Sequence, residues 1–147
     1  MFNKLIIACF FLTAFGSCCH KKGCIDETRV DLISFKNFEK SETDTLRFTG
    51  YSQGSDFSAR TDSFVVYYDS LRVVQGMDGL NYQVQMNIGF DWEVRLSGNN
   101  TVYRINDFVL KEKLCNRCIT GNSYYTSLES YKVNGKIIPA NYLIIEK

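Results

Sequence analysis

Two carboxylates, Asp91 and Glu93, are the residues whose types and spacing come nearest to a catalytic pair. They stand two apart in a segment that alternates apolar and polar residues, so both side chains face the same side of a strand. Such a pair could supply the acid and the base of a glycosidase acting on envelope glycans, or could bind a cation. The alternative is that Asp91, Glu93 and Arg95 form the solvated face of a sheet, with partly offsetting charges. The sequence favours this second interpretation.

Histidine chemistry depends on a single residue, His20. It precedes every segment with a strand pattern, and we interpret it as a solvated linker residue. Ser-His-Asp catalysis, Cys-His catalysis and His-ligated metal sites each need an imidazole inside the folded domain. The sequence therefore predicts a protein that is not an enzyme, with no catalytic residue, no cofactor and no metal site.

Four cysteines, Cys19, Cys24, Cys115 and Cys118, are disulfide candidates if the chain enters an oxidising compartment. Cys115 and Cys118 form a Cys-x-x-Cys motif, which could also be a redox pair or a zinc site completed by Cys19 and Cys24. Turn-forming residues follow the motif, which favours a structural disulfide. Either Cys115 bonds Cys118, or one of them bonds Cys24. The second pairing would close a loop of about 90 residues and stabilise the fold by about 4 kcal/mol.

Two pairs of adjacent tyrosines, Tyr67-Tyr68 and Tyr124-Tyr125, are candidates for a binding surface. Neighbouring strand residues face opposite sides, so one ring of each pair should be exposed. An exposed tyrosine could contact a sugar or a protein partner. The alternative is a strand tyrosine at a sheet edge without a ligand.

Composition excludes several classes of protein. The chain has 147 residues, 45% of them apolar and 22% charged, with a net charge of +1. It is too apolar for a disordered chain, and its charge gives no reason to expect nucleic acid as a partner. The length is that of one globular domain.

The elements that must position these residues are strands. Residues 82–96 alternate apolar and polar side chains, and the length of this run predicts a break or bend at Gly89. A turn at 97–100 leads into a partner strand at 101–105, and Asn134-Gly135 predicts a tight hairpin between 131–133 and 136–138. Further strands are predicted at 29–35, 45–48, 63–68, 71–75, 108–112, 123–128 and 141–145.

These elements predict an all-β fold, an antiparallel immunoglobulin-like β-sandwich of about seven to nine strands. No window shows a convincing capped amphipathic helix. The predicted core consists of apolar residues on the inward positions, namely Phe48, Val84, Met86, Ile88, Phe90, Trp92, Val94, Leu96, Ile105, Val133 and Ile144.

The N-terminus carries a motif for export. Lys4 precedes an apolar run at residues 5–15, which is shorter than the ~20 residues of a spanning helix and has the length of a secretory signal. The following Phe15-Gly16-Ser17-Cys18 resembles the lipobox of bacterial lipoproteins. The resemblance covers residues 1–22 and implies a diacylglyceryl and palmitate anchor on Cys18. Cys19 is a second candidate, and ordinary cleavage after Gly16 would leave Cys18 a plain thiol.

Location and organisation follow from this resemblance. It implies a signal peptide at 1–17, a lipid-anchored tether at 18–27 and one β-sandwich domain at 28–147. The lack of an aspartate after Cys18 implies the outer membrane, and the basic residues that follow favour the periplasmic face. The expected function is a non-enzymatic binding or scaffolding module of the cell envelope, with a protein or glycan partner. The alternative is an inhibitor or immunity lipoprotein that neutralises a toxin or hydrolase.

Overall fold

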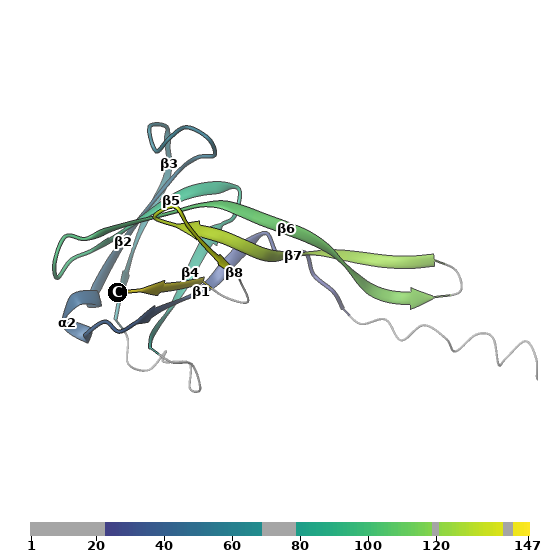
Figure 1. Cartoon of the computed structure of the whole chain (residues 1–147), viewed down its shortest axis with the longest axis horizontal. Helices are drawn as coiled ribbons and strands as arrows, with labels where there is room; N and C mark the ends of the chain where they lie inside the picture. The colour runs from purple at the N-terminus through teal and green to yellow at the C-terminus, as the bar shows by residue number, and fades with distance from the viewer. Residues whose placement is uncertain (1–22, 69–78, 119–120, 140–142) are drawn as a thin grey trace, which may run out of the picture. The chain divides into compact units, whose positions relative to one another are not determined.

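The protein is nearly all β, as the sequence predicts. A computed structural model describes residues 23–68, 79–118, 121–139 and 143–147, which form nine strands and one helical turn (Figure 1). In chain order these are β1 (Arg29–Lys36), α2 (Lys40–Thr43), β2 (Thr45–Ser52), β3 (Arg60–Tyr67), β4 (Leu80–Asn87), β5 (Phe90–Leu96), β6 (Val102–Cys118), β7 (Gly121–Val133), β8 (Lys136–Pro139) and β9 (Leu143–Glu146).

The chain divides into two compact units. The larger comprises Glu27–Lys111 and Leu128–Lys147, and the smaller comprises Met1–Asp26 and Glu112–Ser127. Strands β6 and β7 each contribute residues to both units. The apolar core described below belongs to the larger unit.

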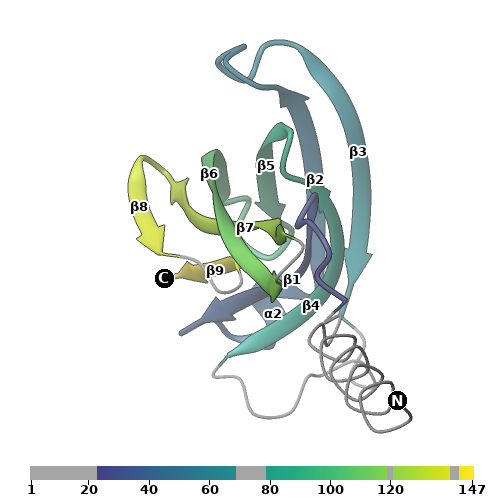
Figure 2. The same ribbon diagram turned by 90° about the vertical axis from the view of Figure 1, so that its right-hand side faces the viewer.

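The strands form two sheets, which confirms the predicted all-β sandwich class. One sheet has the order β4-β1-β9, and the other has the order β3-β2-β5-β6-β7-β8. β1 runs antiparallel to β4 and parallel to β9, while β2 runs antiparallel to both β3 and β5. In Figure 2, β2 lies between β3 and β5.

The long alternating segment supplies one strand to each sheet. β4 ends at Asn87 and β5 begins at Phe90, with a turn at Ile88 and Gly89, so the predicted break at Gly89 is confirmed. The Asn87 side chain holds this turn, because its Oδ1 accepts the Gly89 amide proton at 2.8 Å. The apolar positions of both strands can therefore enter one core although the strands belong to different sheets.

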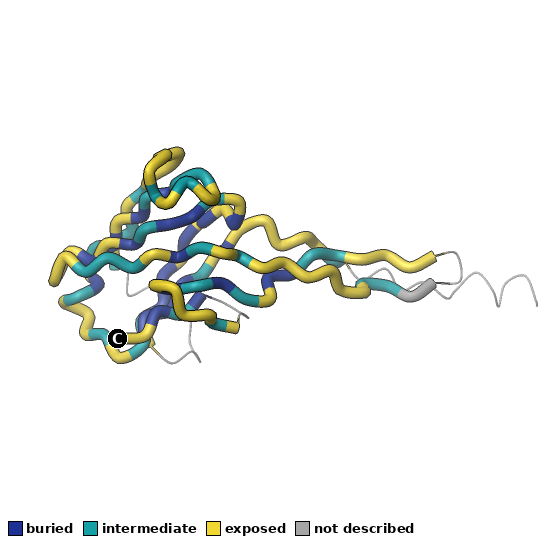
Figure 3. The backbone as a smooth tube through the Cα atoms, turned by 45° about the horizontal axis from the view of Figure 1, so that its top comes forward, coloured by how far each residue is buried: buried dark blue, intermediate teal, exposed yellow. Residues whose placement is uncertain are grey.

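The core contains most of the residues predicted for it. Figure 3 shows the buried positions as short blue stretches along the strands. Of the predicted set, Phe90 is only half-buried and Ile144 does not reach the core. The prediction is wrong for Ile144 because of the register between β9 and β1. In this register Leu143 is the partner of the buried Ile33 and Ile145 is the partner of the buried Phe35, so Leu143 and Ile145 face the core and Ile144 does not.

Turn chemistry predicts some boundaries and misses others. Asn134 and Gly135 have φ values of 48° and 82° and join β7 to β8, which confirms the hairpin. The strands predicted at 101–105 and 108–112 are one strand, β6, which runs through Asp107 despite its φ of 52°. The segments 123–128 and 131–133 likewise merge in β7. The strand predicted at 71–75 lies outside the described residues.

The helical turn α2 is absent from the sequence prediction. It spans only Lys40–Thr43, too short to show a helical period. Its first turn is held by the Glu42 carboxylate, which accepts the Glu39 amide proton at 3.0 Å.

The smaller unit contains a disulfide between Cys24 and Cys115, whose Cα atoms are 5.9 Å apart. This confirms the predicted pairing with Cys24, which closes the long loop. Because Cys115 is bonded to Cys24, it does not form a disulfide with Cys118. In the same unit, the Thr126 amide donates to the Asp26 carboxylate at 2.6 Å. Cys19 and the side chain of Cys118 lie outside the described part of the chain, so their pairing stays a prediction.

Candidate anion-binding site

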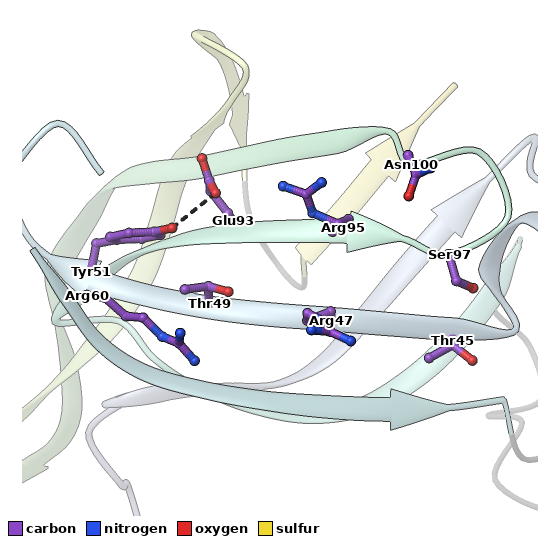
Figure 4. A pocket seen from close by; sticks show the side chains of 9 residues that line it. All are labelled: Thr45, Arg47, Thr49, Tyr51, Arg60, Glu93, Arg95, Ser97 and Asn100. Atoms are coloured by element: carbon purple, nitrogen blue, oxygen red, sulfur yellow. Dashed lines mark hydrogen bonds between the residues drawn. The ribbon is translucent and has the colours of Figure 1, made fainter. Parts of the chain in front are cut away.

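A polar hollow lies on the outer face of β2 and β5, the second and third strands of the six-stranded sheet. Its volume is about 550 Å³. We call it the arginine groove, and Figure 4 shows the side chains that line it: Thr45, Arg47, Thr49, Tyr51, Arg60, Glu93, Arg95, Ser97 and Asn100.

Strand alternation places these residues on the outer face. Along β2, Leu46 and Phe48 are fully buried, while Arg47 is exposed and Thr45, Thr49 and Tyr51 are half-buried. β5 repeats the pattern, with Val94 and Leu96 in the core. The apolar residues of each strand therefore fix which of its polar residues face the groove.

Arg47 and Arg95 are direct cross-strand partners in the β2–β5 pairing. Neither guanidinium forms an ion pair or a side-chain hydrogen bond with the described residues, and both side chains are exposed. Directly opposed like charges destabilise a sheet. The groove thus holds two adjacent, uncompensated, fork-shaped donors, an arrangement that fits a carboxylate or a phosphate.

The one carboxylate in the groove is already neutralised. Glu93 Oε1 accepts from Arg104 Nε at 3.0 Å, and its Oε2 accepts from the Tyr51 hydroxyl at 3.1 Å. Arg104 comes from β6, where it is the register partner of Glu93. Because Glu93 is occupied in this way, the positive charge of Arg47, Arg60 and Arg95 is not cancelled within the groove.

The β2–β3 loop supports one end of the groove. The Phe57 ring lies edge-on to Tyr51 at 5.5 Å, and the Arg104 guanidinium lies 4.8 Å from the Phe57 ring. Burial first, and the nearby Glu93 charge second, raise the pKa of the Tyr51 hydroxyl. Tyr51 therefore keeps its proton at neutral pH and acts as a donor.

The carboxylates Asp91 and Glu93 do not act as an exposed pair. Asp91 is only 6% exposed, and its Oδ2 accepts the Gly54 amide proton at 3.1 Å. It therefore anchors the β2–β3 loop, while Glu93 is held by Arg104 and Tyr51. The predicted solvated face is correct for Glu93 and Arg95 but not for Asp91, which the loop covers.

We expect Asp91→Asn to stabilise the protein more at pH 7 than at pH 3. Burial raises the pKa of Asp91, so the folded state favours its neutral form. Wild-type protein therefore gains stability from the neutral Asp91 side chain at a pH below the pKa that Asp91 has in the unfolded chain. This gain is lost as the pH rises through the higher pKa of Asp91 in the folded protein. Asparagine keeps the acceptor for Gly54 without the charge. Urea unfolding of both proteins at the two pH values measures the difference, and an equal effect at both would contradict the prediction.

The four candidate tyrosines are not brought to one site. Tyr67 is 70% exposed at the β3 edge, whereas Tyr68 is half-buried, with its ring 5.9 Å from Tyr82 and Lys40 4.5 Å above it. Tyr124 is 53% exposed and Tyr125 is half-buried. One ring of each pair is thus exposed, as alternation predicts. Tyr67 belongs to the larger unit, and Tyr124 and Tyr125 to the smaller.

The arginines of the groove are candidate site residues that the sequence analysis did not identify. Arg47 and Arg95 each occupy a polar position of an alternating strand, which is a weak signal alone. Their significance appears only when β2 pairs with β5 in the observed register.

Cys18, the predicted lipidation site, and His20, the predicted linker residue, lie outside the described residues. Within the described ranges, no helix is long and apolar enough to span a membrane, and no group of His, Cys, Asp and Glu could hold a metal ion. No family model, curated protein or solved structure matches the chain.

Proposed function

We propose that the protein is a non-enzymatic binding module of the bacterial cell envelope, and that the arginine groove binds its anionic ligand. A lipid on Cys18 would hold it in the outer membrane, facing the periplasm. The observation that carries the binding proposal is the cross-strand pair of Arg47 and Arg95, which has no carboxylate partner among the described residues.

The electrostatic repulsion between Arg47 and Arg95 supports the proposal of an anionic ligand. Two opposed arginines repel one another and weaken the sheet, whereas a bound anion would turn the repulsion into charge-assisted hydrogen bonds. No aliphatic side chain lines the groove, because β2 and β5 turn their aliphatic residues to the other face. Its charged and hydroxyl-bearing side chains therefore favour a ligand that is held by charge and hydrogen bonding.

Calorimetric titration of the full-length protein in non-ionic detergent tests the proposal. The probes are trigalacturonate, tripolyphosphate and hexa-aspartate. We expect at least one to bind, and Arg47→Gln/Arg95→Gln to weaken its binding by tenfold or more, since each charge-assisted hydrogen bond contributes about 1.5–3 kcal/mol. Without ligand, the same variant should be at least as stable as the wild type, because it removes the repulsion between the two opposed arginines.

A matched variant, Arg29→Gln/Lys136→Gln, removes the same charge from exposed positions outside the groove. It should bind like the wild type. Equal weakening by both variants would show that net charge, not the groove, attracts the ligand, and failure of all three probes would overturn the binding proposal.

The anchor has a separate test. Radiolabelled fatty acid should be incorporated into the wild type and not into Cys18→Ala. Incorporation into Cys18→Ala but not Cys19→Ala would place the lipid on Cys19, and no incorporation at all would refute the lipoprotein assignment.

An inhibitor or immunity protein is the second candidate function. It requires an exposed edge with an aromatic anchor, and β3 is an edge strand carrying Tyr67 at 70% and Val65 at 41% exposure. This function predicts that a single stoichiometric protein co-purifies with the chain and is lost with Tyr67→Ala. Co-purification without such a partner would contradict it.

A further inference from the structure

We propose that the ligand of the arginine groove is an acidic oligosaccharide, a short chain of sugars bearing carboxylates that bind Arg47 and Arg95. This inference rests on the proposed function and names the chemical class of its ligand. Three observations support it: the backbone groups of β2 and β5 are already paired, hydroxyl and amide side chains surround the two arginines, and the exposed Tyr67 is paired with a groove residue.

Backbone groups do not recognise the ligand at this site. β2 is paired on both sides, with β3 and β5, and β5 is paired with β2 and β6. An extended peptide that binds by adding a strand needs a free sheet edge, which the middle of the sheet does not offer. Recognition in the groove therefore depends on side chains.

Apart from Tyr51, Arg60 and Glu93, the side chains around Arg47 and Arg95 are small hydroxyls and an amide. Thr45, Thr49 and Ser97 supply hydroxyl groups and Asn100 supplies a carboxamide. Each of these groups can both donate and accept a hydrogen bond. A sugar presents hydroxyls that also donate and accept, whereas a bare phosphate chain offers acceptors alone. The mixed lining thus fits a ligand that carries hydroxyls as well as negative charge.

An exposed aromatic residue is paired with one residue of the groove. Thr45 on the groove is the register partner of Tyr67 on β3, and Tyr67 is 70% exposed. A tyrosine offers an apolar ring face together with a polar edge, which suits the mixed surface of a sugar ring. The volume of about 550 Å³ falls within the range of about 300–1,000 Å³ of small-ligand sites.

The test compares ligands matched in shape or in charge. Full-length protein in non-ionic detergent is titrated with trigalacturonate, with its fully methyl-esterified form, with tripolyphosphate and with hexa-aspartate. We expect trigalacturonate to bind at least tenfold more tightly than each of the others. The ester keeps the sugar rings and removes the charge, while tripolyphosphate and hexa-aspartate keep the charge and remove the sugar.

Two sets of variants assign the interaction to the groove. Arg47→Gln/Arg95→Gln should weaken trigalacturonate binding by about tenfold to a hundredfold. Thr49→Val, which removes a hydroxyl and keeps the side-chain shape, should weaken trigalacturonate binding several-fold and leave tripolyphosphate binding unchanged. Arg29→Gln/Lys136→Gln should match the wild type with every ligand.

The possible failures are distinguishable. Tighter binding of tripolyphosphate or hexa-aspartate through Arg47 and Arg95 would overturn the saccharide inference and leave the anion-binding function in place. Equal binding of trigalacturonate and its ester would overturn the role of the carboxylates. Binding of none of the probes would overturn the inference and the proposed function together.

Discussion

Replacing Cys24 and Cys115 together by serine should destabilise the protein by about 4–5 kcal/mol, because the disulfide closes a loop with a sequence separation of 91 residues. That loop contains β1 to β5 and most of β6. The bond restricts the unfolded chain most strongly, so its loss favours unfolding. Domains of this kind are stable by about 5–15 kcal/mol, so the change removes a large part of the total.

Urea unfolding followed by Trp92 fluorescence measures the effect. The chain has one tryptophan, and it is fully buried, so its emission reports the state of the core. The comparison is made in the Cys19→Ser/Cys118→Ser background, so that any bond formed by Cys19 or Cys118 does not contribute. In that background, Cys24→Ser/Cys115→Ser should lower the free energy of unfolding by about 4–5 kcal/mol, and adding reductant should abolish the difference. Equal unfolding midpoints with and without Cys24→Ser/Cys115→Ser would contradict the prediction.

The sequence predicts strands well where burial follows a period of two. Residues 82–96 show this most clearly, because alternation identifies the inward residues and Gly89 marks the change of sheet. The prediction fails where a distant strand decides the outcome. The inward face of β9 is set by parallel pairing with β1, and no local pattern in 143–146 distinguishes Leu143 from Ile144.

The candidate site could not be predicted for a related reason. Asp91 and Glu93 are two residues apart, so their spacing suggested chemistry, yet a loop covers one and a neighbouring strand neutralises the other. Arg47 and Arg95 are 48 positions apart, and only strand register brings them together. Hydrophobic alternation specifies which face a residue takes, but not which residue of another strand it meets.

Trp92→Ala should destabilise the protein by about 3–5 kcal/mol, the usual loss for a large aromatic removed from a core. Trp92 has no exposed surface, and its ring lies 5.6 Å from Phe64 and 6.1 Å from Phe90. Its Nε1–H also donates to the Asn87 carbonyl at 2.8 Å, next to the turn where the chain changes sheet. The substitution therefore opens a cavity and leaves that carbonyl without this partner.

Chemical denaturation followed by circular dichroism measures the loss, since the variant has no tryptophan. Tyr67→Ala, which removes an aromatic ring that is 70% exposed, should change stability by no more than about 0.5 kcal/mol. A loss for Trp92→Ala as small as that of Tyr67→Ala would show that the core does not depend on the indole.

The close packing of Gly50 on β2 against the Trp92 indole allows a second test of how the indole contributes to stability. A Cβ at Gly50 would lie 3.1 Å from two atoms of the Trp92 ring and 3.3 Å from the Asp62 Cβ. Gly50→Ala should therefore cost about 1–3 kcal/mol in the wild type, as overpacked cores do. In the smaller Trp92→Phe background, the added methyl group gains room and its cost should fall. A double-mutant cycle measures this coupling, and an additive result would mean that the indole does not set the spacing between β2 and the core.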